Sequence, residues 1–339
     1  MTASPGSGVI GFGVIGIGDI VTGTIAPAIL AEPQAALVAA VSRDQGRAEA
    51  FGAQFGLDFV TTDYASMLAR PDVDVVFIAT PNALHAGEAI QAARAGKHVF
   101  CDKPLATSVP DAEAVVDACE DASVVLGLNF HYRHLPWVEE TRKMISEGTL
   151  GEIQTIDVDI GSGTRDYTNW RIDQAMAGIG SLYNVGVHML DALSVILQAE
   201  PVEVSAMFDR SPSSGQVEMQ ALVLIRFDNG TLVFTNCNER TKYPRNTITI
   251  HGSKGRLIGD NLTRSREEGT LHLHTADTQT STTFPPPGAH QLCVSQFAKA
   301  VLAGERPRAT GADGLRSMRL CDAIVRSVVE KRHVLVEQP

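Results

Sequence analysis

Short apolar runs alternate with longer helix-like segments through the first third of the chain. Residues 9–15 are apolar and strand-like, and residues 20–30 follow with helical periodicity. The alternation continues through strand-like runs at 36–41, 74–79, 97–100 and 124–128 and helix-like segments at 44–55, 83–95 and 111–119. Strands separated by helices in this way build a parallel sheet with helices on both faces. The first part of the chain is therefore expected to form a doubly wound α/β domain.

The pattern changes after Asn129. Helix-like segments follow at 137–147, 181–197, 290–302 and 311–329, and strand-like runs at 152–160, 202–208, 219–227, 231–238 and 246–251. Asp228-Asn229-Gly230 is a strong hairpin turn sequence, and 252–255 is another. These features predict an α+β domain built on a large, mostly antiparallel sheet, with loops at 161–173 and 262–287. A chain of 339 residues is long enough for two domains. We expect them to span residues 1–130 and 131–339.

Composition excludes several classes of function. A formal net charge of -11 argues against a partner with a phosphate backbone, so no nucleic acid is expected. No apolar run reaches the ~20 residues that a membrane span needs. The five cysteines form no C-x-x-C pair, which favours reduced buried thiols over a metal site or disulfides. The segment 1–8 has no basic or apolar leader region, so a cytoplasmic location without a membrane partner is expected.

A glycine-rich turn at the end of the first strand is the first candidate site. Gly16 permits a tight turn, and Gly18 lets backbone amides approach a pyrophosphate at a helix start formed by Asp19 and Ile20. The third small residue of the dinucleotide-binding pattern is replaced by Val21, which weakens the match. A formally complete alternative at 11–16 lies inside the strand, where glycines have packing uses. The position of the turn between strand and helix favours a Rossmann cofactor site.

The tip of the second strand bears on the choice of cofactor. An NAD site is expected to carry a carboxylate there for the ribose 2′-hydroxyl. This chain has Ser42 and Arg43, whose hydroxyl and guanidinium suit a 2′-phosphate. NADP(H) is therefore favoured, with NAD(H) as the alternative. Arg43 also has a simpler interpretation as a solvated residue at a helix start.

Polar residues follow two further strands of the predicted sheet. Thr80, Pro81 and Asn82 are expected to lie over the cofactor, with His85 as a packing or cofactor-edge residue. Asp102, Lys103 and Pro104 follow the next strand, where an open α/β sheet delivers side chains to a ligand. A Lys-Pro pair is usually a surface turn, but at this position the Lys103 amine can hold a hydroxyl and transfer a proton. The expected cofactor contacts are Gly16, Gly18, Asp19, Ile20, Ser42, Arg43, Thr80, Pro81, Asn82, His85, Asp102 and Lys103.

The helix-like segment 181–197 carries a second polar constellation. Asn184, His188 and Asp191 are four and three residues apart, so they share one helix face. Gly186 within the helix costs ~1 kcal/mol relative to alanine, which suits a place where another group packs closely. Each residue alone has a structural interpretation, but the group predicts a substrate site. Side chains that could hold a polyol through hydrogen bonds and an apolar platform are Trp170, Arg171 and Tyr132.

Together these motifs resemble the glucose-fructose oxidoreductase, inositol dehydrogenase and rhizopine-catabolism family (Gfo/Idh/MocA). The similarity spans about residues 9–336, and its markers are the Gly16/Gly18 turn, 79–82 with His85, 95–99, Asp102-Lys103-Pro104, 151–153 and 186–188. The resemblance implies a Rossmann domain, an open-faced sheet domain that often forms dimers or tetramers, and hydride transfer between a nicotinamide and a sugar or polyol. It also implies that Lys103 and His188 act at the reacting carbon. Segments 169–171, 251–259 and 306–314 are similar to the NADP-dependent 1,5-anhydrofructose reductase branch, where Arg171 matches a substrate-site arginine.

One residue departs from the family pattern. Asn184 stands where the family commonly has an aspartate one turn before the histidine. An amide can hold a hydroxyl and orient His188, but it cannot take up a proton as a carboxylate would. Asn184, Lys103 and His188 are the expected catalytic residues, with proton transfer left to Lys103 or His188. The departure leaves a non-catalytic, nucleotide-dependent sensor on the same fold as the alternative function.

Overall fold

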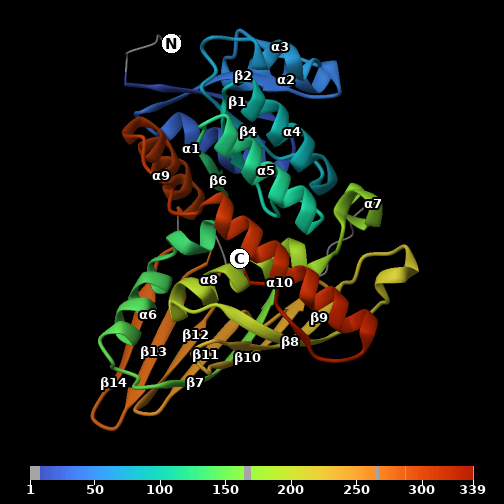
Figure 1. Ribbon diagram of the computed structural model, residues 1–339. Helices are drawn as coiled ribbons and strands as arrows, with labels where there is room; N and C mark the ends of the chain where they lie inside the picture. Colours follow the sequence, from blue (N-terminus) through green and yellow to red (C-terminus); the bar gives the residue numbers. More distant parts are fainter. Residues whose placement is uncertain (1–7, 164–168, 264–266, 287, 339) are drawn as a thin grey trace. The chain divides into compact units, whose positions relative to one another are not determined.

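The structure is a computed structural model that describes residues 8–163, 169–263, 267–286 and 288–338. The chain forms two compact units (Figure 1). The first contains the residues up to Phe130 together with His290–Met318, and the second contains His131–Ala289 and the residues from Arg319 onward.

The first unit contains a six-stranded sheet with the order β3-β2-β1-β4-β5-β6. Every strand pair in it is parallel. Its strands are β1 (Ile10–Ile15), β2 (Ala35–Val41), β3 (Val60–Thr61), β4 (Val75–Ile78), β5 (His98–Cys101) and β6 (Leu126–Leu128). The strand order reverses between β1 and β4, and ligands bind beyond the carboxyl ends of the strands at such a reversal. The predicted doubly wound fold is confirmed.

Helices pack on this sheet around a core of buried apolar side chains. The helices are η1 (Val21–Ile25), α1 (Ala26–Ala31), α2 (Gln45–Phe55), α3 (Tyr64–Leu68), α4 (Asn82–Arg94), α5 (Val109–Asp121) and α9 (Ala289–Ala303). The sequence boundary placed α9 in the second domain, but its side chains pack in the first unit. Phe297 stacks on Phe100 of β5 with ring centroids 4.6 Å apart. A Cβ on Gly127 would lie 2.5 Å from the Phe297 ring, so glycine leaves room for that aromatic ring on β6. Helix α10 (Gly311–Glu330) then begins in the first unit and ends in the second.

The second unit contains a nine-stranded sheet with the order β14-β13-β12-β11-β7-β10-β9-β8-β15. Its strands are β7 (Ile153–Gly161), β8 (Pro201–Phe208), β9 (Gln220–Phe227), β10 (Leu232–Asn238), β11 (Thr247–Gly252), β12 (Gly255–Asp260), β13 (Gly269–Thr275), β14 (Gln279–Phe284) and β15 (Val334–Leu335). β7 and β10 are parallel, and the other pairs are antiparallel. The mostly antiparallel sheet is confirmed. The loop expected over 262–287 was wrong, because β13 and β14 pair there.

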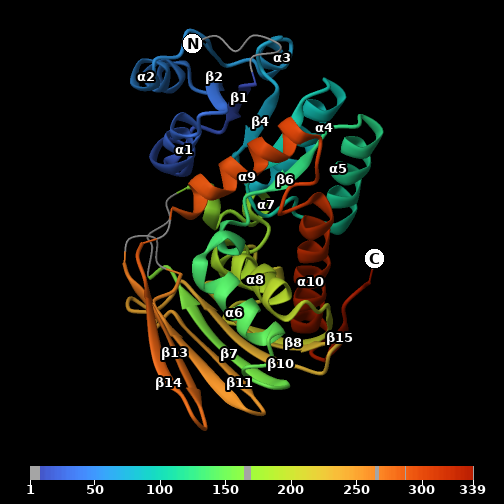
Figure 2. The same cartoon turned by 90° about the vertical axis from the view of Figure 1, so that its left-hand side faces the viewer.

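One face of the second sheet is covered and the other is open. Burial alternates along β9, as expected for a strand with one covered face. Helices α6 (Pro136–Ser146) and α8 (Val187–Leu197) lie on the covered face (Figure 2). Shorter helices of this unit are η2 (His131–His134), η3 (Trp170–Ile172), α7 (Gln174–Ala177), η4 (Leu182–Gly186) and η5 (Pro212–Ser214). The continuous stretch Gln174–Leu197 is long and apolar enough to cross a membrane by length and composition, but 78% of its most apolar window is buried inside the fold.

Candidate active site

The turn after β1 leaves no room for a side chain at Gly16. Gly16 has φ +90, and a Cβ there would lie 2.5 Å from the backbone of Ala79 and Thr80. Gly18 is exposed, and a Cβ built on it meets nothing within 4 Å. The space beside Gly18 is therefore open to a ligand, and a larger residue at this position would fill part of it. These observations fit a dinucleotide pyrophosphate approaching the backbone amides.

The structure also explains the imperfect glycine pattern. Val21, at the third position of the pattern, is fully buried and belongs to the apolar core. The alternative glycines lie inside β1 as the sequence indicated. A Cβ on Gly11 would clash with the Asp72 carbonyl, and one on Gly13 would lie 2.7 Å from the Met67 sulfur. Gly11 and Gly13 are thus packing glycines, and Asp19 and Ile20 begin the helical segment after Gly18.

The end of β2 presents a hydroxyl and a guanidinium. Ser42 is buried, and its Oγ accepts a hydrogen bond of 3.2 Å from the Asp44 amide. Its hydroxyl proton can therefore be donated elsewhere. Arg43 is exposed, while Asp44 caps helix α2 by accepting from the Arg47 amide at 2.9 Å. The strand tip can thus offer two donors to an anion.

His85 ties together the loops that leave β4 and β5. Its Nε2 lies 2.9 Å from the Thr80 carbonyl oxygen, and its Nδ1 lies 2.7 Å from the Pro104 carbonyl oxygen. Burial lowers the pKa of His85, and the hydrogen bond to Pro104 opposes that effect. The ring lies between the Thr80 loop and the Lys103-Pro104 turn, within hydrogen-bond distance of one carbonyl oxygen of each. A neutral imidazole has one N–H, so it donates to one of these two carbonyls at a time.

Glu88, one turn further along α4, was not singled out from the sequence. Its carboxylate accepts a hydrogen bond of 2.5 Å from the Thr80 hydroxyl. Burial raises the pKa of Glu88 to about 7, and the Thr80 hydrogen bond acts in the opposite direction. Asn82, also expected at the cofactor, is buried at the start of the same helix.

A polar chain lies beside the half-buried Lys103 in the first unit. Asn129 donates from Nδ2 to Asp102 Oδ1 at 3.1 Å, and His290 Nδ1 lies 3.2 Å from Asn129 Oδ1. Because the amide oxygen can only accept, His290 carries its proton on Nδ1. Burial lowers the pKa of His290 to about 4, so the ring is neutral near pH 7. His290 is distant in sequence from the strand ends, and no motif marked it.

In the second unit, His188 begins α8 within an aromatic cluster. The Tyr132 ring stacks on it with centroids 4.9 Å apart, and the His131 ring meets it edge-on at 4.2 Å. Burial raises the pKa of Tyr132 to about 12. The sequence predicted Tyr132 as a substrate contact, which stays a prediction; in the structure its ring stacks on the His188 imidazole.

Asp191 is engaged by a neighbouring arginine. Arg133 donates from Nε and Nη2 to the two carboxylate oxygens of Asp191, each at 2.6 Å, and both side chains are buried. The sequence placed Asp191 at the substrate because it shares a helix face with His188. Its bidentate pairing with Arg133 fastens the 131–133 segment to α8, and its contact with substrate stays a prediction.

Asn184 meets a buried carboxylate that the sequence did not reveal. It donates from Nδ2 to Glu239 Oε2 at 2.9 Å, and Ser162 donates from Oγ to Glu239 Oε1 at 2.7 Å. Glu239 is 1% exposed. Trp170 and Arg171 form a separate pair on η3, with the guanidinium 4.5 Å from the indole centroid.

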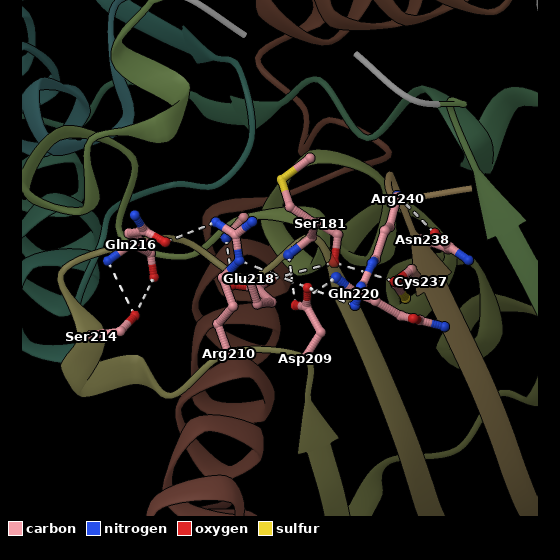
Figure 3. A network of polar contacts seen from close by, with 12 residues as sticks. Ser181, Asp209, Arg210, Ser214, Gln216, Glu218, Gln220, Cys237, Asn238 and Arg240 are labelled. Atoms are coloured by element: carbon pink, nitrogen blue, oxygen red, sulfur yellow. Dashed lines mark hydrogen bonds and ion pairs between the residues drawn. The ribbon is translucent and has the colours of Figure 1, made fainter. Parts of the chain in front are cut away.

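A second buried carboxylate caps the helical segment that carries Asn184 and His188. Glu218 accepts from the amides of Gly180 at 2.7 Å and Leu182 at 2.9 Å, and from the Ser181 hydroxyl at 3.4 Å (Figure 3). Burial raises the pKa of Glu218 to about 7, and the two amide hydrogen bonds oppose it. Glu218 satisfies backbone donors that a helix start otherwise leaves without partners.

Comparison with known proteins assigns this architecture to a family. Residues 10–130 match the oxidoreductase family with an NAD-binding Rossmann fold, and residues 138–258 match the Gfo/Idh/MocA C-terminal domain. The chain belongs to the Gfo/Idh/MocA oxidoreductase family. The resemblance drawn from the sequence motifs is thereby confirmed.

Members of the Gfo/Idh/MocA family resemble the chain over most of its length. It is 30% identical over 304 residues to 1,5-anhydro-D-fructose reductase from Ensifer adhaerens, which covers 89% of this chain and 91% of the relative. A levoglucosan dehydrogenase in complex with NADH and levoglucosan superimposes with a TM-score of 0.87 at 27% identity, over 97% of this chain and 100% of the other. A mutant 3-ketoreductase from Actinomadura kijaniata, in complex with TDP-benzene and NADP, gives a TM-score of 0.86 at 30% identity, over 94% and 98%.

Proposed function

We propose that the protein transfers hydride between NADP(H) and the carbonyl or alcohol carbon of a sugar or polyol, with NAD(H) as a weaker cofactor. The observation that carries the proposal is the placement of Lys103 at the carboxyl end of β5. His85 binds the turn after Lys103 to the Thr80 loop, which itself closes over Gly16. Lys103 thus stands one residue before a backbone carbonyl that contacts His85, in the same unit as the glycine turn.

The residues divide into cofactor-binding and substrate-binding roles. Gly16, Gly18 and the Thr80 loop would hold the dinucleotide, whose nicotinamide supplies or accepts the hydride when bound. Lys103 exchanges a proton with the substrate oxygen as that oxygen gains or loses negative charge. His188, held by its aromatic neighbours, is the second proposed catalytic residue, and Asn184 is proposed to hold a substrate hydroxyl. Arg171, with Trp170 beneath it, binds further hydroxyl groups.

The preference for NADP(H) rests on the end of β2. Arg43 is exposed and Ser42 retains a hydroxyl proton, so both can donate to a 2′-phosphate. The nearest carboxylate, Asp44, has Oδ1 engaged in the cap of α2. One relative is known in complex with NADH and another in complex with NADP. The proposed preference for NADP(H) therefore depends on this strand tip and not on membership of the family.

The names of the relatives support the substrate class. They include a reductase of 1,5-anhydro-D-fructose and a dehydrogenase of levoglucosan, both anhydro sugars. The aromatic and amide groups around His188 suit a ring that carries several hydroxyl groups.

We also propose a cytoplasmic location.

The open face of the second sheet supports self-association. It exposes apolar side chains from three adjacent strands: Met207, Leu222, Leu224, Leu232 and Phe234. A hollow on this face is lined by Asp157, Glu203 and Arg226, and the last two form an ion pair of 3.0 Å. A two-fold axis would bring the same patch of two copies together. We therefore propose a homodimer, or a tetramer built from it, through this face.

The direct test is absorbance at the nicotinamide band. NADPH oxidation is screened with keto-sugars and aldoses, and NADP⁺ reduction with aldoses, anhydro sugars and inositols, each repeated with the NAD couple. The proposal predicts turnover with members of one sugar class and faster rates with the phosphorylated cofactor. Tight NADPH binding without turnover across the whole panel would overturn it and favour a nucleotide-dependent sensor.

A further inference from the structure

Two strand ends bring a carboxylate to Asn184. β7 and β10 are parallel, with Gly161 opposite Asn238. Ser162 and Glu239, the residues that follow these two strands, therefore lie side by side at the same end of the sheet. There Glu239 receives the Ser162 hydroxyl on one oxygen and the Asn184 amide on the other.

The chemistry of this contact fixes the orientation of the Asn184 side chain. An ionised carboxylate has acceptors and no donors, so the group facing it must be the amide nitrogen. The carbonyl oxygen of Asn184 then lies on the other arm of the amide. Burying a carboxylate is unfavourable unless donors replace water, and the two donors named above serve that purpose.

The position of Glu239 also bears on the departure from the family pattern. Asn184 occupies the place where an aspartate is common, one turn before His188. In this chain a carboxylate is still present within hydrogen-bond distance of that place, but it comes from β10. The pair Asn184–Glu239 thus keeps a carboxyl group near this place and adds an amide in front of it.

We propose that Glu239 is a positioning residue of the active site, which holds Asn184 so that its carbonyl oxygen accepts a hydrogen bond from a substrate hydroxyl. This inference rests on the proposed function. It defines the substrate more closely, because a hydroxyl donor must stand beside the reacting carbon. A deoxy analogue at that position would leave the Asn184 oxygen without its substrate donor.

Exchanging the amide of Asn184 and the carboxyl group of Glu239 tests the proposal. Glu239→Gln removes the acceptor-only group, so either end of Asn184 can face it, and kcat/KM is expected to fall about tenfold. Asn184→Asp sets two carboxyl groups within hydrogen-bond distance, where they cannot both be ionised. That variant should lose activity progressively as pH rises, giving an additional alkaline limb at lower pH than any limb of the wild type.

The double variant Asn184→Asp/Glu239→Gln separates positioning from simple structural damage. Its glutamine can donate to the new aspartate, which again presents an oxygen acceptor to the substrate. We expect kcat/KM to return to within a fewfold of the wild type and the alkaline limb to disappear. A structural contribution alone would make the two losses multiply rather than cancel.

The same two strands provide a matched control. Asn236 on β10 donates from Nδ2 to Asp159 Oδ2 on β7 at 3.4 Å. Asn236→Asp repeats the amide-to-carboxylate change in another such pair, and it should leave both kcat/KM and the pH profile as in the wild type.

The outcomes distinguish the two proposals. A wild type without turnover on any sugar overturns the proposed function. An active wild type in which the single variants keep full kcat/KM, or in which the double variant shows no recovery, overturns the role of Glu239. An alkaline limb in Asn236→Asp of the same size as in Asn184→Asp would also overturn it.

Discussion

In the proposed function, proton transfer depends on Lys103. It follows β5, the neighbour of β4 at the reversal of strand order, and the ring of His85 fixes the turn through the Pro104 carbonyl. A flexible lysine is otherwise a poor proton-transfer group because many of its conformations are unproductive.

Replacing Lys103 with alanine is expected to lower turnover by ~10²–10⁴-fold, since it removes the group that exchanges the substrate proton. Cofactor affinity should change little, because Gly16, Gly18 and the strand tip of β2 remain. Steady-state kinetics and NADPH fluorescence titration measure the two quantities. Lys299→Ala, an exposed lysine on α9, is the control. Equal turnover in Lys103→Ala and Lys299→Ala would remove Lys103 from the mechanism.

Replacing Arg43 with alanine is expected to reduce the preference for NADP(H) over NAD(H) by about 10- to 100-fold, the value of one or two charge-assisted contacts to a phosphate. The effect should appear in KM for NADP(H) and leave KM for NAD(H) nearly unchanged. Kinetics with both cofactors give the ratio. Arg94→Ala, at the end of α4, is the matched control. An unchanged ratio would show that Arg43 is only a solvated residue at a helix start.

At the scale of elements, the helical segment that carries Asn184 and His188 depends on Glu218. Glu218→Ala removes the carboxylate that accepts hydrogen bonds from the amides of Gly180 and Leu182. The free energy of unfolding is expected to fall by about 1–3 kcal/mol, because these donors lose their acceptor. Denaturant unfolding measures the change. Glu147→Ala, an exposed glutamate at the end of α6, should lie within about 0.5 kcal/mol of the wild type.

Glu218 also predicts how stability varies with pH. Its pKa is about 7 in the fold and near the ordinary 4.5 when unfolded, so the native state holds the proton more tightly between these values. Its contribution to stability is full below pH 4.5 and is lost as pH rises through 7. Glu218→Gln should therefore flatten the decline of unfolding free energy between pH 5 and 8. Glu88 shifts in the same direction, so part of the decline remains. An unchanged slope in Glu218→Gln would contradict this assignment.

The sequence was sufficient to predict those elements whose pattern of apolar and turn residues lies within a short segment. The apolar runs of the parallel sheet, the Gly16 turn and the 181–197 helical stretch were all predicted. β14 was missed because its sequence, Gln-Thr-Ser-Thr-Thr-Phe, is almost wholly polar and lies exposed at the sheet edge. α9 was assigned to the wrong unit because an apolar helix face does not specify the sheet that it covers.

The site residues divide in the same way. Lys103, His85 and His188 stand in recognisable motifs at strand ends and on a helix. Glu218 and Glu239 were missed because their partners lie 36 to 77 residues away in sequence. The pairing of Asp191 with Arg133 was missed for the same reason, because Arg133 lies 58 residues upstream. Pairings of this kind arise from tertiary packing and leave no local periodicity.

At the scale of the whole molecule, the open sheet face predicts association. Leu224 is 57% exposed and Met207 is 74% exposed, and both lie on this face. Contiguous apolar groups on a sheet surface mark an interaction site. The opposite face of the same sheet is already occupied by α6 and α8.

Leu224→Glu is expected to break the proposed interface, so that a dimer becomes a monomer and a tetramer becomes a smaller species, because it places a charge in the apolar face of each copy. Light scattering after size-exclusion chromatography gives the mass directly. Leu302→Glu makes the same change on an exposed leucine of α9 and should leave the mass unaltered. A monomeric wild type would contradict the proposed interface.

The most direct test of the central claim follows the hydride itself. Wild-type protein is incubated with a sugar substrate and NADPH that carries deuterium at the transferred position of the nicotinamide, and the product is examined by mass spectrometry and NMR. We predict a product one mass unit heavier, with the deuterium on the new carbinol carbon, and a rate lowered ~10²–10⁴-fold in Lys103→Ala. Deuterium that stays in the cofactor, or that reaches the sugar equally fast without Lys103, would contradict the account.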